Sequence, residues 1–244
     1  MPKSDNRQRY DRQIKMDDIG PAGQGKLNAA SVLIVGAGGL GSPAALYLAA
    51  AGVGTITIVD PDRIELSNLN RQILHGVADI GALKVDSAKA SVRRLNPNIT
   101  VNSHPVAMTA DNASDLLKGC HVAIDALDNL DSRLILNQAA LGHRIPLIHG
   151  AVQGFDGRAL TILPGESACL KCLHNRPAVE DSPSPVIGVA PAVIGAIQAT
   201  EAVKVILGIG DLLTNRLMIY EGLQMRWTTF SLSRNPRCSH CGHL

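Results

Sequence analysis

Short apolar runs alternate with longer helical patterns through the first half of the chain. Ser31–Val35 and Thr55–Val59 are rich in β-branched residues, as buried parallel strands are. Residues 43–51 and Lys84–Leu95 have the apolar spacing of helices, and Ser42 is a candidate cap for the first of them. Single helices between successive strands predict a Rossmann-like α/β fold with a doubly wound, mostly parallel sheet.

The pattern continues and then changes character in the second half. The remaining elements of the parallel part are expected to be strands at 99–102, Val122–Asp125 and 146–149 and a helix at 130–141. The second half contributes strands at 157–163, 216–220 and Arg226–Ser231 and a long apolar helix at 191–207. Because no helical pattern separates the last two strands, we expect a C-terminal antiparallel extension of the sheet.

Composition narrows the class of protein. Hydrophobic residues make up 45% of the chain and charged residues 18%, which excludes wholesale disorder. Aromatic residues make up only 2% and the net charge is +2, so we expect neither a nucleic-acid nor a membrane partner.

The N-terminus lacks the pattern of a secretory signal. The two most hydrophobic stretches of the chain do not predict membrane helices. Glycines break residues 44–59, and residues 186–210 contain Gln198, Glu201 and Lys204. We therefore expect a cytoplasmic protein.

A glycine-rich loop follows the first strand. Its sequence is Gly-Ala-Gly-Gly-Leu-Gly, with glycines at Gly36, Gly38, Gly39 and Gly41. Glycines let the backbone turn tightly and approach a phosphate, and the helix behind the loop favours negative charge. Asp60 ends the next strand, where a carboxylate can accept hydrogen bonds from ribose hydroxyls. The loop predicts a nucleotide site, although alone it is typical of NAD or FAD binding and is compatible with a tight turn that binds nothing.

Basic residues after the second strand favour nucleotidyl transfer over hydride transfer. Arg71 lies in the segment 67–74, and Lys84 begins the next helix. The α-phosphate of a nucleotide gains charge when it is attacked, and the departing pyrophosphate carries more. Arg71 and Lys84 can neutralise that charge through charge-assisted hydrogen bonds, each contributing roughly 1.5–3 kcal/mol. Taken singly, each of them is also compatible with a solvated surface residue.

Two aspartates close the strand Val122–Asp125 at the edge of the sheet where ligands bind. Asp128 is a candidate ligand of a Mg²⁺ ion that bridges phosphates, because Mg²⁺ prefers carboxylate oxygens. The alternative is that Asp128 caps the helix at 130–141, and one residue can do both. Asp125 is expected to lie deeper.

The chain has five cysteines, four of them in two CxxC pairs. The pairs are Cys169 with Cys172 and Cys238 with Cys241, and four thiolates are the ligand set of structural zinc. The long separation between the pairs leaves redox chemistry or plain thiols open. Cys120 stands alone and is expected to be a packed core residue.

A family resemblance unites these motifs. In chain order, its features are residues 9–14 (RYDRQI), the glycine loop, residues 67–72 (SNLNRQ), Lys84, Asp128 with Asn129, and the CxxC pairs. Together they resemble the ThiF/MoeB/HesA branch of the ubiquitin-activating-enzyme-like superfamily, and ThiF and MoeB most of all.

The resemblance implies an adenylyltransferase. It would use ATP to adenylate the C-terminal Gly-Gly carboxylate of a small ubiquitin-like sulfur-carrier protein of the ThiS or MoaD type. The products would be an acyl-adenylate and pyrophosphate, in thiamine or molybdopterin biosynthesis. A separate sulfur donor protein would act afterwards.

The resemblance also assigns roles to single residues. It implies a homodimer in which Arg12 reaches the ATP phosphates of the neighbouring subunit. It gives Asp60 to ribose, magnesium to Asp128, and phosphates and catalysis to Asn68, Arg71 and Lys84, with Asn129 beside the nucleotide. The cysteine pairs would bind Zn²⁺.

These roles divide one domain, 1–244, into three parts. They are an N-terminal arm and helix at 1–30, a nucleotide-binding part at 31–150, and a carrier-binding and zinc-binding part at 151–244.

One departure from the family pattern concerns the loop after the first CxxC pair. ThiF and MoeB have a cysteine there, whereas this chain has Ser182 and Ser184. A serine hydroxyl cannot form a persulfide or an acyl disulfide, so we expect adenylation without a covalent sulfur intermediate in this loop. Three other hypotheses remain: adenylation of a peptide or another carboxylate in a biosynthetic or metallocofactor pathway, an NAD-binding oxidoreductase, and an inactive partner subunit.

Overall fold

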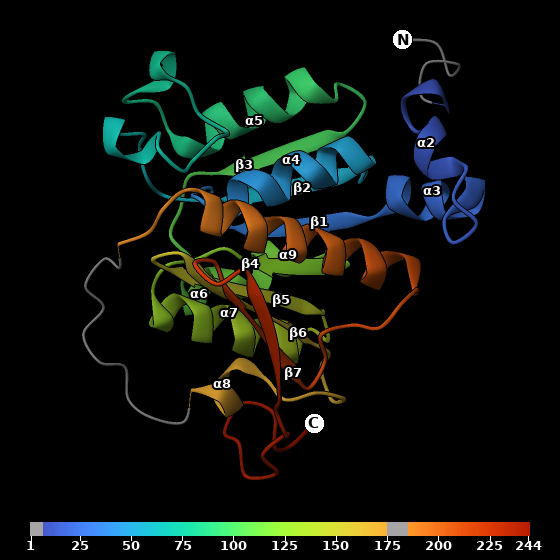
Figure 1. Ribbon diagram of the computed structural model, residues 1–244, viewed down its shortest axis with the longest axis vertical. Coiled ribbons are helices and arrows are strands. Elements are labelled where there is room, and N and C mark those ends of the chain that lie inside the picture. The colour runs from blue at the N-terminus through green and yellow to red at the C-terminus, as the bar shows by residue number, and fades with distance from the viewer. Residues whose placement is uncertain (1–6, 175–184) are drawn as a thin grey trace.

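Eight strands form one mixed sheet in the order β3-β2-β1-β4-β5-β6-β7-β8 (Figure 1). The computed structural model describes residues 7–174 and 185–244. The strands are β1 Ser31–Val35, β2 Thr55–Val59, β3 Thr100–His104, β4 Val122–Asp125, β5 Leu147–Gln153, β6 Asp156–Ile162, β7 Arg216–Glu221 and β8 Arg226–Ser231. Strands β1 to β5 pair in parallel, and β5 to β8 pair antiparallel, so both the parallel sheet and its antiparallel extension are confirmed.

Helices cover both faces of the parallel sheet. The helices of the described residues are α2 Asp11–Ile14, α3 Gly20–Ala29, α4 Gly41–Ala51, α5 Lys84–Leu95, α6 Ala110–Leu117, α7 Leu130–Gly142, α8 Leu170–Leu173 and α9 Val189–Leu207. Two 3₁₀ turns are η1 Leu66–Asn68 and η2 Val77–Asp79. Figure 1 shows α4, α5 and α9 on one side of the sheet and α6 and α7 on the other. The residues of β1 alternate accordingly: Val32 and Ile34 pack with the first group, and Leu33 and Val35 with the second.

The long helix α9 packs across the middle of the sheet and fixes the two halves of the fold together. The side-chain amide of Gln198 donates to the carbonyl oxygens of Asp125 (2.7 Å) and Ile148 (3.1 Å). Glu201 accepts a hydrogen bond from the Thr161 hydroxyl. By length and composition alone, α9 would be long and apolar enough to cross a membrane. Its buried polar contacts with the strands are those of a core helix.

Two local expectations need correction. Helix α4 begins at Gly41 with Leu40 as its N-cap residue, so Ser42 lies inside the helix and does not cap it. Its hydroxyl instead accepts from the Leu74 amide (3.4 Å). The helix starts two residues earlier than its apolar pattern, because Gly41 of the glycine loop is already its first residue.

The pattern of apolar residues also gave no sign of α6. The helix has only eight residues, and its buried positions, Ala113 and Leu117, form a single helical repeat. A capping box starts it, in which the Thr109 amide donates to Asn112 (2.9 Å).

Candidate active site and metal site

A cavity of ≈ 800 Å³ opens at the carboxyl ends of the parallel strands. It lies where the strand order reverses between β1 and β4, which is where open α/β sheets bind their ligands. At one end, the lining comes from the glycine loop, the end of β2 and the start of α5. At the other end, strands β5, β6 and β7 line it, and the turn after β4 lies between.

The glycine loop is held in a shape that only glycine permits. Gly36 has φ +104°, and a Cβ there would lie 2.4 Å from the carbonyl oxygen of Ala126. A Cβ on Gly41 would lie 1.9 Å from the carbonyl oxygen of Gly36. Within the described residues, the amides of Gly38 and Gly39 have no hydrogen-bond partner, and both residues line the cavity. Such amides are suited to phosphate oxygens.

Asp60 lies beneath this loop. Its carboxylate accepts from the amides of Ala37 (2.8 Å) and Asp62 (2.9 Å), and it belongs to the cavity lining. Burial raises the pKa of Asp60, although the charge of Lys84 and the two amides oppose the shift. The structure therefore shows a contact between Asp60 and the loop backbone. Its role in ribose binding stays a prediction.

Lys84 pairs with an aspartate that follows the end of β2. It is the first residue of α5, and its Nζ lies 2.7 Å from the Asp62 carboxylate. The lysine side chain is 8% exposed and the aspartate 60%, so a buried ammonium is balanced by one solvated partner. Both line the cavity. Sequence reasoning missed Asp62, although its position just after Asp60 at the same strand end was a usable signal.

The segment after β2 brings Arg71 to the cavity but not Asn68. The Arg71 guanidinium donates to the carbonyl oxygen of Ser67 and to the side chain of Asn70, both at 3.0 Å. The Asn68 side chain accepts from the Glu65 amide (3.1 Å) and closes turn η1, outside the cavity lining. A phosphate role for Asn68 stays a prediction.

The turn after β4 separates the roles of Asp128 and Asn129. Asn129 is the N-cap of α7, and its side chain accepts from the Ser132 amide at 2.9 Å. The alternative in which Asp128 caps this helix is therefore wrong. Asp128 is exposed and lines the cavity, and among the described residues its one hydrogen bond comes from the Asn129 side chain, at 3.4 Å. Its carboxylate is available for a hard cation, and both residues line the cavity as expected.

A buried polar network holds that turn from below. Asp125 is fully buried and accepts from His149 Nδ1 (2.7 Å) and from the Leu127 amide (3.1 Å). The Arg133 guanidinium lies 3.7 Å from Asp125 and donates from Nε to the Leu127 carbonyl oxygen (3.2 Å). Burial lowers the pKa of His149. The network fixes both sides of Leu127 and thereby the position of Asp128 next to it.

Arg12 lies elsewhere on this chain. It is exposed on α2 and is not part of the cavity lining. Figure 1 shows α2 beside α3, which leads into the amino end of β1, whereas the cavity lies at the carboxyl ends. A role of Arg12 at the nucleotide therefore requires a second copy of the chain. Ser182 and Ser184 lie outside the described residues.

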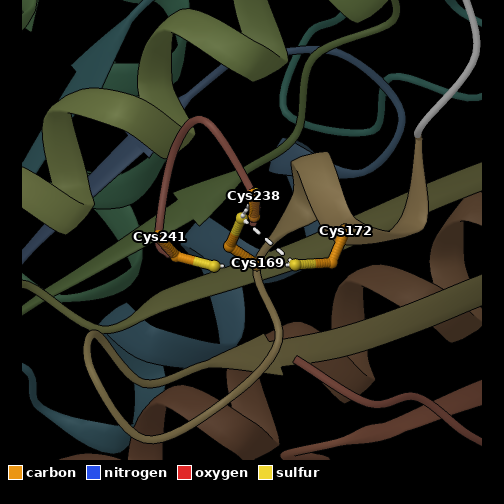
Figure 2. A group of neighbouring side chains, drawn as sticks. All are labelled: Cys169, Cys172, Cys238 and Cys241. Carbon is orange, nitrogen blue, oxygen red and sulfur yellow. Dashed lines mark hydrogen bonds between the residues drawn. The ribbon is translucent and has the colours of Figure 1, made fainter. Parts of the chain in front are cut away.

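The four paired cysteines come together in space. Figure 2 shows their sulfur atoms directed toward one another, all within 4.8 Å. Cys169 and Cys238 are 3.7 Å apart at Sγ, and Cys172 and Cys241 are 3.5 Å apart. A tetrahedral zinc with Zn–S bonds of about 2.3 Å requires sulfur separations of roughly 3.8 Å. The donor set and its geometry fit zinc, which the residues would hold as thiolates.

The backbone favours the thiolate form at one of these cysteines. Burial raises the pKa of Cys238, but the amides of Cys241 and His240 and neighbouring thiols lower it, to about 7. A thiolate at neutral pH is what a metal ion requires of its ligand.

Asn137 connects both cysteine loops to α7. Its side-chain oxygen accepts from the Leu170 amide (3.0 Å), and its side-chain nitrogen lies 2.9 Å from Nδ1 of His240. Asn137 is fully buried. Each CxxC loop therefore has one direct hydrogen bond to the helix that begins beside Asp128.

Similar proteins place this geometry in context. The model of the ThiF family matches residues 10–240. The SAMP-activating enzyme E1 of Haloferax volcanii is 43% identical, over 96% of this chain and 88% of that protein. The sulfur carrier protein adenylyltransferase of Thermus thermophilus is 42% identical, over 96% of this chain and 90% of that protein.

Solved structures share the fold at lower identity. The microcin C7 biosynthetic enzyme MccB, in complex with N-formylated MccA, has a TM-score of 0.83 and 23% identity, over 99% of this chain and 77% of that chain. PaaA has a TM-score of 0.81 and 24% identity, over 96% of this chain and 76% of that chain. These likenesses concern the fold alone.

Proposed function

Because the chain belongs to the ThiF family, we propose that it adenylates the C-terminal Gly-Gly carboxylate of a ubiquitin-like sulfur-carrier protein at the expense of ATP. One observation carries the proposal: a single cavity joins a glycine loop with free amides to Lys84, Arg71 and an uncommitted Asp128. The relatives at 43% and 42% identity, whose names refer to SAMP activation and to sulfur-carrier adenylylation, support this substrate.

The reaction forms one bond and breaks another at the α-phosphate. A carboxylate oxygen of the tail attacks the α-phosphorus, the bond to the β-phosphate bridging oxygen breaks, and pyrophosphate leaves with the electron pair. The carboxylate is ionised at neutral pH, so no general base is required. Catalysis then consists of holding the reactants in line and neutralising charge.

The residues of the cavity divide this task. The amides of Gly38 and Gly39 bind phosphate oxygens. Arg71 and Lys84 neutralise the phosphate charge, and Lys84 exchanges its contact with the exposed Asp62 for a contact with ATP. Asp128 would hold a Mg²⁺ ion, which when bound draws charge from the phosphates.

The assembly and setting belong to the same proposal. The exposed position of Arg12 supports a homodimer in which Arg12 of one subunit completes the cavity of the other. A cluster of four cysteines supports zinc and a reducing, cytoplasmic compartment. A separate protein would supply sulfur to the adenylate. Thiamine and molybdopterin biosynthesis are the pathways in which such carriers act.

The first test is pyrophosphate exchange. The purified protein is expected to exchange ³²P-labelled pyrophosphate into ATP only when a sulfur carrier ending in Gly-Gly is present, because exchange requires reversible adenylate formation. The same carrier without its last glycine serves as the control, and intact-mass analysis should detect the adenylated carrier. Equal exchange with and without the carrier contradicts the proposal.

A second test addresses the dimer. Arg12→Ala and Asp128→Ala subunits are each expected to be nearly inactive, because each site then lacks one essential group. Mixed under conditions that allow subunit exchange, they should regain activity, because one site of each mixed dimer has both native residues. A mixture no more active than its components argues that Arg12 does not act across an interface. Two preparations of the same variant, mixed identically, give the baseline.

Adenylation of a peptide or other carboxylate is the second candidate. The fold shared with MccB in complex with N-formylated MccA is compatible with it. The relatives at 42–43% identity favour the sulfur carrier over it, and over an NAD-binding oxidoreductase or an inactive subunit. A peptide substrate would be revealed by pyrophosphate exchange with the peptide and none with the carrier.

A further inference from the structure

Arg158 is a cation of the cavity whose side chain is left without a partner by the described part of the chain. It lies on β6, between Ala151 of β5 and Ile219 of β7, and lines the end of the cavity opposite the glycine loop. Its Nε is fully buried, and within residues 7–174 and 185–244 its side chain makes no hydrogen bond or ion pair. An unpaired guanidinium in such a place destabilises the protein unless an anion joins it.

The neighbouring acid is already committed elsewhere. Asp125 is the carboxylate that acts on the charge of Arg158, but it is hydrogen-bonded to His149 and lies 3.7 Å from Arg133. Burial lowers the pKa of Arg158 and the charge of Arg133 lowers it further, with Asp125 opposing both. An arginine remains charged at neutral pH despite such shifts. This end of the cavity therefore has uncompensated positive charge.

Asp156, on the same strand, is also engaged. Its carboxylate accepts from the Gly222 amide at 3.1 Å, in the turn between β7 and β8. Arg133 offers an instructive contrast to Arg158, because its guanidinium donates to two backbone carbonyl oxygens, those of Leu127 and Gly150. One buried arginine of the cavity thus serves the fold, whereas the other is left for a ligand.

Two anions enter the cavity during the proposed reaction. The phosphates of ATP are matched by the glycine loop, Arg71 and Lys84 at the other end. The terminal carboxylate of the carrier tail has no such match among those residues. Arg158 interacts electrostatically with both Asp125 and Arg133, which hold the turn of Asp128, so its guanidinium lies near that turn.

We propose that Arg158 binds the C-terminal carboxylate of the carrier tail and orients it for attack on the α-phosphate. The guanidinium contacts the carboxylate oxygen that does not attack, so the contact persists with the carbonyl oxygen of the acyl-adenylate. Arg158 thereby selects a free carboxyl terminus over a blocked one. This assignment rests on the proposed function and adds a substrate-binding residue to it.

The kinetic test compares Arg158→Gln, Arg158→Lys and Arg93→Gln with the wild-type protein in pyrophosphate exchange. Arg93 is an exposed residue of α5 outside the cavity lining. Arg93→Gln removes one arginine charge, so it has the same net charge as Arg158→Gln and serves as the matched control. Losing a charge-assisted contact should raise the KM for the carrier by about 10- to 100-fold in Arg158→Gln. The KM for ATP should change less than about 2-fold, and Arg158→Lys should recover part of the loss because it restores charge without the planar fork.

The stability of the variants separates binding from folding. The Tm of Arg158→Gln should equal or exceed that of the wild-type protein, because an unpaired buried charge is removed. A rise in the KM for ATP alone would identify Arg158 as a phosphate ligand and overturn the assignment. Unchanged kinetics, or a lowered Tm with both KM values unchanged, would overturn it as well.

A binding measurement tests the assignment without any reaction. Fluorescently labelled peptides ending in Gly-Gly, one with a free carboxylate and one amidated, are titrated with the protein and followed by anisotropy. The wild-type protein should prefer the free carboxylate by about 10-fold or more, and Arg158→Gln should lose the preference. Wild-type protein that does not distinguish the peptides overturns the assignment. Absent pyrophosphate exchange would refute the adenylation proposal instead, while the peptide titration would still report on Arg158.

Discussion

Replacing Asp128 with alanine is expected to reduce carrier-dependent pyrophosphate exchange by at least about 100-fold, the usual effect of removing one group that stabilises transition-state charge. Asp128 is exposed in the cavity, and in the part of the chain that the structure describes its one partner is the Asn129 side chain, at 3.4 Å. The fold should therefore tolerate the change, with thermal unfolding within about 2 °C of the wild-type value. The measurement is initial-rate exchange at saturating ATP and carrier, repeated across a Mg²⁺ titration.

Asp131→Ala provides the matched control for this variant. Asp131 is an exposed aspartate in the first turn of α7, three positions after Asp128, and is not part of the cavity lining. It should retain nearly full activity. If both variants lose activity equally, the loss reflects the charge of the helix end and not a ligand role of Asp128. Activity of Asp128→Ala at the wild-type level would exclude the proposed magnesium site.

Replacing Cys241 with serine is expected to cause the largest loss of stability. Its sulfur is fully buried in the four-cysteine cluster, 3.5 Å from that of Cys172. Loss of a structural metal is among the most destabilising changes and is expected to lower the free energy of unfolding by about 4 kcal/mol or more. That corresponds to a decrease in Tm of roughly 10 °C for a chain of this size. Metal analysis of the wild-type protein should find about one zinc ion per chain, and the variant should retain little.

Cys120→Ser is the control for Cys241→Ser, because it removes a thiol that lies outside the four-cysteine cluster. Cys120 is half-buried, and its thiol donates to the Leu116 carbonyl oxygen at 3.7 Å, away from the cluster. Its zinc content should equal that of the wild-type protein. Chelation of the wild-type protein should reproduce the Tm decrease of Cys241→Ser. Unchanged stability after complete removal of zinc would show that the cysteine cluster does not depend on a metal.

The parts of the fold that the sequence predicted best are the elements decided by local patterns. β1, β2, β4, β8 and α5 have the expected bounds, because β-branched runs and helical spacing end at clear turns. The start of α4 was misjudged because a glycine loop is also a helical turn. α6 escaped notice because it has only eight residues, whose two buried positions form a single helical repeat.

In the candidate site, too, the residues of local motifs were predicted and the contacts between distant segments were not. Motif residues such as Lys84, Arg71 and Asp128 do line one cavity, as their spacing and the family resemblance suggested. Contacts between distant segments were beyond a reading of the sequence, since nothing local indicates that Arg133 braces Leu127 or that Arg158 lacks a partner. Hydrogen bonding also redistributed roles, giving the cap of α7 to Asn129 and leaving Asp128 free.

The bridge made by Asn137 also sets an order of events as the chain is synthesised. A chain that has emerged from the ribosome only as far as β7 has the Cys169 pair and the Leu170 contact, but neither the second cysteine pair nor His240. Of the two contacts that Asn137 makes with the cysteine loops, only the one to Leu170 is then possible. Metal binding by all four thiolates, and the contact of Asn137 with His240, become possible only after residues 238–241 have been made. Full anchoring of α7 therefore has to wait until the second cysteine pair has been synthesised.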